Sequence, residues 1–372
     1  MKASITLAAL ATLAAAGTAT AQSGQIDVGG AQKVMVTSRT TGSTFNDPSF
    51  FPAASQLTGQ ANLNLNYTGV GTIGCTGSLL WTGRHILTAA HCVSESTNDI
   101  RVASGVARFR NGSGGFNSYN ITQQAIVRAG YSGAVVEEQD VAIITLDQEV
   151  ASVHQRYNIH SGDATGSRTL LAGYGRIGTG LTGDNTSSTQ FTATPDLRRG
   201  WNRFDTSCTE AAGPSPIFAT CANNANGNKG AFGGILMMDF DNPTNANASD
   251  LCTSALGICV GAESGGAMGD FDETGVGRGD SGGGAFNEAS GGIVGVASWG
   301  VGNGVNLSQF GRVNGYACVA NNAANAACLA NYNFIINTVG APATVIPEPS
   351  TYALIATGLA GLALARRRRS AK

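Results

Sequence analysis

A serine surrounded by glycines stands in residues 277–284, which read Gly-Arg-Gly-Asp-Ser-Gly-Gly-Gly. Glycine lets the backbone adopt positive φ and approach a bound group closely. A serine displayed in this way, beside backbone N–H groups, suits acyl transfer, because that chemistry needs a nucleophile and donors for the oxyanion. A simple Gly/Ser turn is the alternative in a chain with 52 glycines. Ser281 is therefore a candidate nucleophile only if the chain also supplies a base and an orienting acid.

The candidate base is His91. All four histidines, at positions 85, 91, 154 and 160, precede Ser281. The α/β-hydrolase fold needs its histidine after the serine, so the order excludes that fold. His91 follows an expected apolar strand and a run of small residues, which leave room beside an imidazole. Its neighbour Cys92 can tether this loop to Cys75.

The candidate acid is Asp140, which stands where the polar residues 137–139 meet the apolar run 141–144. A carboxylate at this junction is expected at the edge of the core, where it can orient an imidazole and stay ionised. Glu137 and Glu138, just before it, are expected to be solvated surface charges. A cap at the start of the strand is the alternative role for Asp140 alone.

Three segments occur in the order His, Asp, Ser: Thr-Ala-Ala-His-Cys (88–92), Asp-Val-Ala-Ile (140–143) and Gly-Asp-Ser-Gly-Gly (279–283). They resemble the signature segments of the chymotrypsin/trypsin-like serine proteases. Ala-Gly-Tyr-Gly (172–175) is similar to the A-G-W-G between the barrels of that family, and Ser-Trp-Gly (298–300) to its cleft strand. The resemblance runs from about Gly74 to Val339. It implies an all-β fold of two six-stranded antiparallel barrels, with a C-terminal helix and the cleft between the barrels.

The resemblance also implies roles for single residues. Ser281 would be the nucleophile, His91 the general base and then acid, and Asp140 the group that fixes the histidine tautomer. The backbone N–H groups of Gly279 and Ser281 would form the oxyanion hole. The expected substrate-binding residues are Gly275, Ser298, Trp299 and Gly300, the last three pairing with the substrate backbone as an added strand.

The chain departs from the family pattern at three places. Gly275 stands six residues before Ser281, where trypsin has an acid, so a strict Arg/Lys preference is not expected. Gly277 replaces a usual cysteine. Trypsin-like zymogens are cut before an Ile-Val-Gly-Gly motif, for which the chain offers only Ile-Asp-Val-Gly-Gly at 26–30, too far upstream of His91 and with no basic residue before it. Arg39-Thr40 is another possible cut site. In those zymogens, the aspartate at the position of Asp280 binds the new amino terminus. Which group binds Asp280 in this chain is therefore left open.

The elements that must position these residues are predicted to be strands. Short apolar runs bounded by turn residues favour a sandwich or barrel. The expected strands are 78–81, 85–89, 121–127, 141–146, 169–172, 235–238 and 293–298, with a further one at 33–37. Residues 329–339 are expected to form a helix, and the Gly/Thr/Asn-rich residues 177–188 an exposed loop.

Both ends of the chain indicate export. Lys2, an apolar run and Ala-Thr-Ala at 19–21 predict a signal peptide over residues 1–21. Pro-Glu-Pro at 347–349 precedes an apolar run and four arginines, and resembles the PEP-CTERM sorting signal of Gram-negative bacteria, which an exosortase is thought to process. A plain tail anchor is the alternative. The predicted organisation is a signal peptide (1–21), an N-terminal segment (22–58), a protease domain (59–340), a linker (341–351) and a short transmembrane sorting segment with a basic tail (352–372).

Eight cysteines in the exported part predict disulfides rather than a metal site. The simplest pairing joins sequence neighbours: Cys75–Cys92, Cys208–Cys221, Cys252–Cys259 and Cys318–Cys328. The carboxylates in 239–250 and 270–273 could bind Ca²⁺, but turn chemistry is the commoner use of such clusters. No cofactor or metal is expected.

The chain has 12% charged residues and a formal net charge of −2, which gives no reason to expect nucleic acid as a partner. The resemblance implies an exported serine endopeptidase, displayed at the surface or envelope or secreted. Its partners would be protein or peptide substrates and an exosortase-type machinery, with membrane contact only through the C-terminal segment. A non-catalytic surface or matrix-binding protein on a protease scaffold is the alternative, because a fold alone does not give a function.

Overall fold

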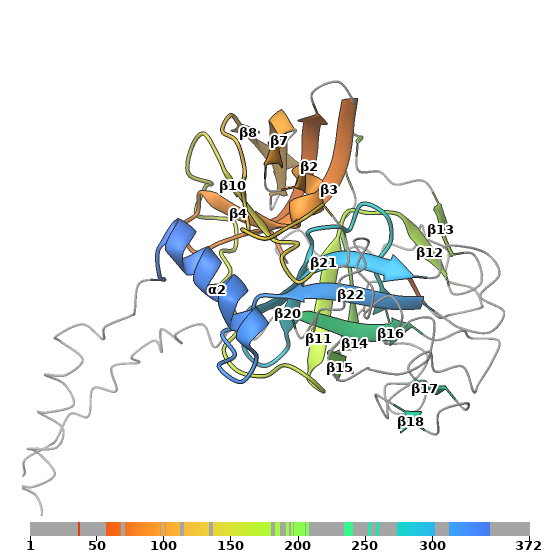
Figure 1. The fold of residues 1–372 in the computed structure, drawn as a ribbon. Coiled ribbons are helices and arrows are strands. Elements are labelled where there is room, and N and C mark those ends of the chain that lie inside the picture. The colour runs from red at the N-terminus through yellow and green to blue at the C-terminus, as the bar shows by residue number, and fades with distance from the viewer. Residues whose placement is uncertain are drawn as a thin grey trace, which may run out of the picture. The chain divides into compact units, whose positions relative to one another are not determined.

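The computed structural model contains two separate seven-stranded antiparallel sheets, seen in Figure 1 as an orange and yellow group and a green and blue group. The residues that it describes are 36–37, 57–67, 71–96, 98–100, 102–111, 115–133, 137–179, 183–186, 191–192, 195, 197–204, 206–207, 234–240, 252–253, 258–259, 274–301 and 312–342.

The first sheet has the strand order β8-β7-β2-β3-β4-β10-β9. Its strands are β2 (Gln60–Tyr67), β3 (Gly71–Leu79), β4 (His85–Thr88), β7 (Val102–Arg110), β8 (Phe116–Ile121), β9 (Ile126–Val127) and β10 (Ala142–Thr145). A bridge between Ile121, at the end of β8, and Leu146, which follows β10, joins one edge of this order to the strand next to its other edge, so the sheet curls toward a barrel. In β2, alternation places Ala61, Leu63 and Leu65 fully inside, as expected where one face of a strand packs on the core.

The second sheet has the order β14-β11-β20-β21-β22-β16-β15. Its strands are β11 (Arg168–Gly173), β14 (Arg198–Arg203), β15 (Thr206–Ser207), β16 (Ile235–Phe240), β20 (Gly284–Asn287), β21 (Ile293–Val301) and β22 (Arg312–Cys318). The predicted trypsin-like all-β fold of two antiparallel barrels is confirmed. Each sheet has one strand more than the six expected, because a two-residue strand, β9 or β15, pairs at its edge. Strands this short leave no periodic pattern in the sequence.

The prediction that residues 177–188 form a loop is wrong in part. They contain β12 (Ile177–Thr179) and β13 (Gly183–Thr186), which pair with each other. Together with β1 (Val36–Thr37) and β19 (Thr274–Gly275) they form a four-stranded sheet in the order β13-β12-β1-β19. Pairing between distant segments stabilises these short strands, including β13, which consists mostly of residues with low strand propensity. Two further pairs are β5 (Ser94–Ser96) with β6 (Asp99–Ile100), and β17 (Cys252–Thr253) with β18 (Ile258–Cys259).

Helix α2 (Ala326–Val339) follows the second sheet and begins three residues before the predicted start. Its first turn is capped by Asn325, whose Oδ1 accepts hydrogen bonds from the backbone N–H groups of Ala327 and Cys328. The disulfide Cys318–Cys328 ties this first turn to the end of β22. The helix is thus fixed to the second sheet at its start.

Several predictions fall on residues outside the described ranges. These are the signal peptide, the sorting segment 352–372 and the Cys208–Cys221 pair, while of Cys252 and Cys259 the structure gives only that they are partners in β17 and β18. Residues 340–372 form a unit separate from residues 1–339. Within the described ranges, no helix has the length and hydropathy needed to cross a membrane.

Candidate active site

His91 lies just after β4, in the short 3-10 helix η2 (Ala90–Cys92). The predicted disulfide between Cys75 and Cys92 is present and connects η2 to β3. The hydroxyl of Tyr67 donates a hydrogen bond to the backbone carbonyl of His91 at 3.2 Å. Neighbouring strands and a covalent bond therefore hold the backbone of His91 in place.

Asp140 has 0% exposure and contacts His91 twice. Its Oδ1 accepts the backbone N–H of His91 at 2.8 Å, and its Oδ2 lies 2.7 Å from His91 Nδ1. Because a carboxylate only accepts hydrogen bonds, this contact places the proton of a neutral imidazole on Nδ1 and leaves Nε2 as the acceptor. That is the tautomer a general base requires. The other histidines bond to neutral groups: His85 to Thr82, His154 to Asn117 and the Thr58 carbonyl, and His160 to Ser290.

Two opposing effects act on the pKa of His91. Burial lowers it, because a cation is poorly solvated there, whereas the negative charge of Asp140 and the hydrogen bond to it raise it. The net pKa lies above the ordinary value of 6.5. The same carboxylate that selects the tautomer thus also stabilises the imidazolium.

Thr76, which was not predicted as a site residue, fixes the loop that carries Ser281. Its backbone N–H donates to the Ser281 carbonyl at 2.8 Å, and its hydroxyl donates to the Gly279 carbonyl at 3.0 Å. Its carbonyl accepts the hydroxyl of Thr88, at the end of β4, at 2.9 Å. Thr76 thereby connects the Ser281 loop to the strand that leads to His91. None of the hydrogen bonds among the described residues joins the Ser281 hydroxyl to His91; such contacts are often long before substrate binds.

Gly282 must be a glycine where these segments meet. Its φ is +82°, and an added Cβ would lie 2.1 Å from Thr88 Oγ1 and 2.3 Å from the Thr76 carbonyl oxygen. The close approach of the Ser281 loop to β3 and β4 therefore depends on the absence of a side chain at this position.

The carboxylate of Asp280, whose partner the sequence left open, accepts backbone hydrogen bonds on both oxygens. Gly175 N–H donates to Oδ1 and Gly277 N–H to Oδ2, each at 2.7 Å. An added Cβ at Gly173 would lie 2.1 Å from Asp280 Oδ1, and one at Gly175 would lie 2.6 Å from Asp280 N. The glycines of the Ala-Gly-Tyr-Gly segment thus leave space for Asp280.

The four expected substrate-binding residues lie on two strands. Gly275 is in β19, opposite Val36 of β1. Ser298, Trp299 and Gly300 are in β21. The side chain of Ser298 does not serve as a free surface group: its hydroxyl donates to Asp140 Oδ2 at 2.5 Å. Trp299 is 7% exposed, and its indole lies directly over Gly315.

The expectation that Glu137 and Glu138 are solvated surface charges is wrong for Glu137 and incomplete for Glu138. Glu137 is 3% exposed and accepts hydrogen bonds from both the backbone N–H and the hydroxyl of Ser132, which compensate its burial. Glu138 is partly buried, and burial raises its pKa although Gly234 N–H donates to its Oε2. The contact between Gly234 and Glu138 joins segments that are far apart in the sequence and leaves no local sequence signal.

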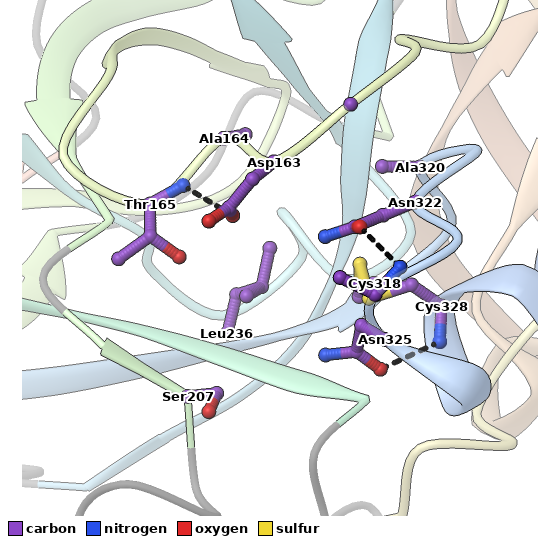
Figure 2. Close-up of a pocket in the computed structure, with 12 residues that line it drawn as sticks. Asp163, Ala164, Thr165, Ser207, Leu236, Cys318, Ala320, Asn322, Asn325 and Cys328 are labelled. Atoms are coloured by element: carbon purple, nitrogen blue, oxygen red, sulfur yellow. Dashed lines mark hydrogen bonds between the residues drawn. A yellow bond between two sulfur atoms is a disulfide. The ribbon is translucent and has the colours of Figure 1, made fainter.

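A small cavity of about 140 Å³ lies away from these residues, beside the Cys318–Cys328 disulfide (Figure 2). Its polar lining includes Asp163, Thr165 and Asn322 and none of the candidate catalytic residues, so it is not the expected substrate site. Among the described residues, no group of three or more His, Cys, Asp or Glu side chains could hold a metal ion.

Comparisons with known proteins agree with the motifs. Residues 52–213 match the Trypsin family model, and residues 345–369 match the model of the PEP-CTERM protein-sorting motif. No curated protein matches the chain significantly.

Among solved structures, the chain is similar to HL collagenase, with 19% identity, a TM-score of 0.47 and coverage of 78% of this chain and 97% of that chain. It is also similar to a Glu endopeptidase in complex with MPD (16%, TM-score 0.43, coverage 75% and 90%). A third is a thermostable serine protease from an extremophilic microorganism (12%, TM-score 0.45, coverage 76% and 99%). Residues 52–213 thus resemble a trypsin domain, and the C-terminal residues 345–369 carry the PEP-CTERM sorting motif.

Proposed function

We propose that the protein is a serine endopeptidase that cleaves peptide bonds through an acyl-enzyme formed on Ser281. The observation that carries the proposal is the double contact between Asp140 and His91, at 2.8 and 2.7 Å, in a domain of the trypsin family. This contact supplies an oriented base of the right tautomer. Thr76 ties the Ser281 loop to the same strands.

In the proposed reaction, Ser281 Oγ attacks the carbonyl carbon of the substrate while its proton passes to His91 Nε2. Asp140 stabilises the imidazolium, and the backbone N–H groups of Gly279 and Ser281 bind the oxyanion. The C–N bond then breaks as His91 returns the proton to the leaving amine. Water, deprotonated by His91, releases the acid product and regenerates Ser281.

Substrate would bind as an added strand along Ser298, Trp299 and Gly300. Gly275 offers no charge to a side chain beside it, so we expect no strict preference for Arg or Lys at the cleaved bond. A peptide-library cleavage profile measures this preference directly.

The test of the enzymatic proposal is covalent labelling of Ser281. The purified mature protein should react with a fluorophosphonate probe, whereas Ser281→Ala should not. If the processed wild-type protein stays unlabelled while folded, the enzyme proposal is wrong. The alternative, a non-catalytic surface or matrix-binding protein, would then be favoured.

The sorting motif supports export and display at the surface or envelope, with processing by an exosortase-type enzyme. Deletion of residues 347–372 should change how much of the protein is retained at the envelope in cell fractionation. Unaltered fractionation would exclude a sorting role for this segment. The mass of the retained wild-type protein separates processing from a permanent anchor, because only processing shortens its C-terminus.

A further inference from the structure

Asn331, in the middle of α2, lies at a junction of three segments that are far apart in the sequence. Its side chain is 1% exposed. The two hydrogens of its Nδ2 are used by two backbone carbonyls, those of Glu138 at 2.6 Å and Cys318 at 2.8 Å. One amide group therefore connects α2 to the end of β22 and to the loop just before Asp140.

The Glu138 carbonyl belongs to the tight turn that delivers Asp140. Within this turn the N–H of Asp140 donates to the Glu137 carbonyl at 3.1 Å. Only Gln139 separates the residue whose carbonyl is held by Asn331 from Asp140, whose carboxylate bonds His91 and Ser298. A shift of the Glu138 peptide is thus transmitted to Asp140 over a very short length of backbone.

The helix that carries Asn331 is itself fixed. Cys328, three residues before Asn331, is bonded to Cys318, and Asn325 caps the first turn; Figure 2 shows the disulfide and this cap together at the start of the helix. Packing is also close beside Glu138, since a Cβ added to Gly234 would lie 2.7 Å from Glu138 Cβ and 2.8 Å from Ala327 Cβ. The turn before Asp140 is therefore held against a rigid surface made by α2 and the second sheet.

We propose that Asn331 is a positioning residue for the catalytic acid: through the Glu138 carbonyl it holds Asp140 at bonding distance from His91. This inference rests on the proposed function, in which Asp140 orients the general base. Asn331 contacts neither substrate nor the reacting atoms. Through Asn331, the C-terminal helix α2 helps to position Asp140 and, through Asp140, His91.

The test replaces Asn331 with leucine, which has nearly the same shape but no donor. The control is Ile335→Val, a change at a fully buried position one turn further along α2. In a Ser281→Ala background, the pKa of His91 is measured by NMR titration of its imidazole. We expect this pKa to fall toward the ordinary value of about 6.5 in Asn331→Leu and to stay at the wild-type value in Ile335→Val. In the active protein, kcat should fall about ten- to a hundredfold with little change in KM.

A purely structural role of Asn331 predicts a lower melting temperature for Asn331→Leu but no change in the pKa of His91. An unchanged His91 pKa in the folded variant would therefore overturn the proposal, whatever its melting temperature. If Asn331→Leu does not fold, Asn331→Ser, which keeps one donor, is measured in the same way with the same criterion. The titration needs no activity. A protein that fails to react with the fluorophosphonate probe but shows the pKa change would therefore contradict the proposed function and still support the role of Asn331.

Discussion

The hydroxyl of Ser298 and the Nδ1 of His91 bond to the same oxygen of Asp140, at 2.5 and 2.7 Å. Asp140 stands just before β10 of the first sheet and Ser298 lies in β21 of the second, so this contact joins the two sheets. A residue expected from its motif to bind substrate through its backbone thus also stabilises the buried acid through its side chain.

Ser298→Ala removes this donor and leaves its backbone unchanged. We expect a loss of about 2 kcal/mol in the free energy of unfolding, because a hydrogen bond to a buried charged group is lost. Activity should fall mainly in kcat, since substrate pairing along β21 is retained. Denaturant unfolding and steady-state kinetics measure the two effects. A rise in KM with constant kcat would show instead that Ser298 acts on substrate binding.

The acid limb of kcat/KM against pH should have its midpoint above 6.5. The general base must be neutral, and the net pKa of His91 is raised by Asp140. Activity is therefore lost as the pH falls through this raised pKa and His91 becomes protonated. Asp140→Asn removes the charge while burial remains, so the midpoint should move to lower pH.

Asp140→Asn should also reduce kcat by about 10³- to 10⁴-fold, because an amide can hold the wrong tautomer. If the midpoint is the same in wild type and Asp140→Asn, the acid limb does not reflect the protonation of His91.

Asp280→Asn should impair the loop that contains the proposed oxyanion hole. The amide has one oxygen where the carboxylate uses two, so Gly175 N–H or Gly277 N–H would face another donor. A buried unsatisfied donor costs about 1–3 kcal/mol. Because Asp280 lies between Gly279 and Ser281, we expect kcat to fall by about 10²-fold or more.

The matched control for this change is Asp163→Asn, in which the replaced carboxylate lies in a surface loop and, within the described part of the chain, accepts the nearby Thr165 N–H. It should leave kcat and the melting temperature close to wild type. Full activity of Asp280→Asn would contradict a link between this carboxylate and catalysis.

Gly282→Ala should be strongly destabilising, by more than the comparable change at Gly166. Both glycines have positive φ, +82° and +75°, but an added Cβ at Gly166 meets nothing within 4 Å. Backbone strain alone costs about 1–2 kcal/mol, and only Gly282→Ala adds a clash with Thr88 and Thr76. Thermal unfolding of the two variants isolates the clash. Equal melting temperatures would show that the Ser281 loop can move away from β3 and β4.

The sequence by itself identified the chemical groups. A glycine-flanked serine, a histidine between a strand and a cysteine, and an aspartate at the start of an apolar strand are local patterns, and their order excluded one hydrolase fold. Short apolar runs bounded by turn residues predicted the class of fold, and neighbouring cysteines predicted the two disulfides at Cys75–Cys92 and Cys318–Cys328. Each of these signals lies within a few residues of the feature that it predicts.

Tertiary structure decided how the groups are held. The contacts of Thr76 with the Ser281 loop, of Ser298 with Asp140 and of Asn331 with the Glu138 carbonyl join residues 158 to 205 positions apart. Polar side chains of this kind have many possible partners in a sequence. The pairing of β1 with β12 and β19 depends in the same way on distant contacts. Hydrogen bonds between segments that meet only after folding leave no spacing to detect, so the support of Asp140 and Ser281 could be seen only in the folded chain.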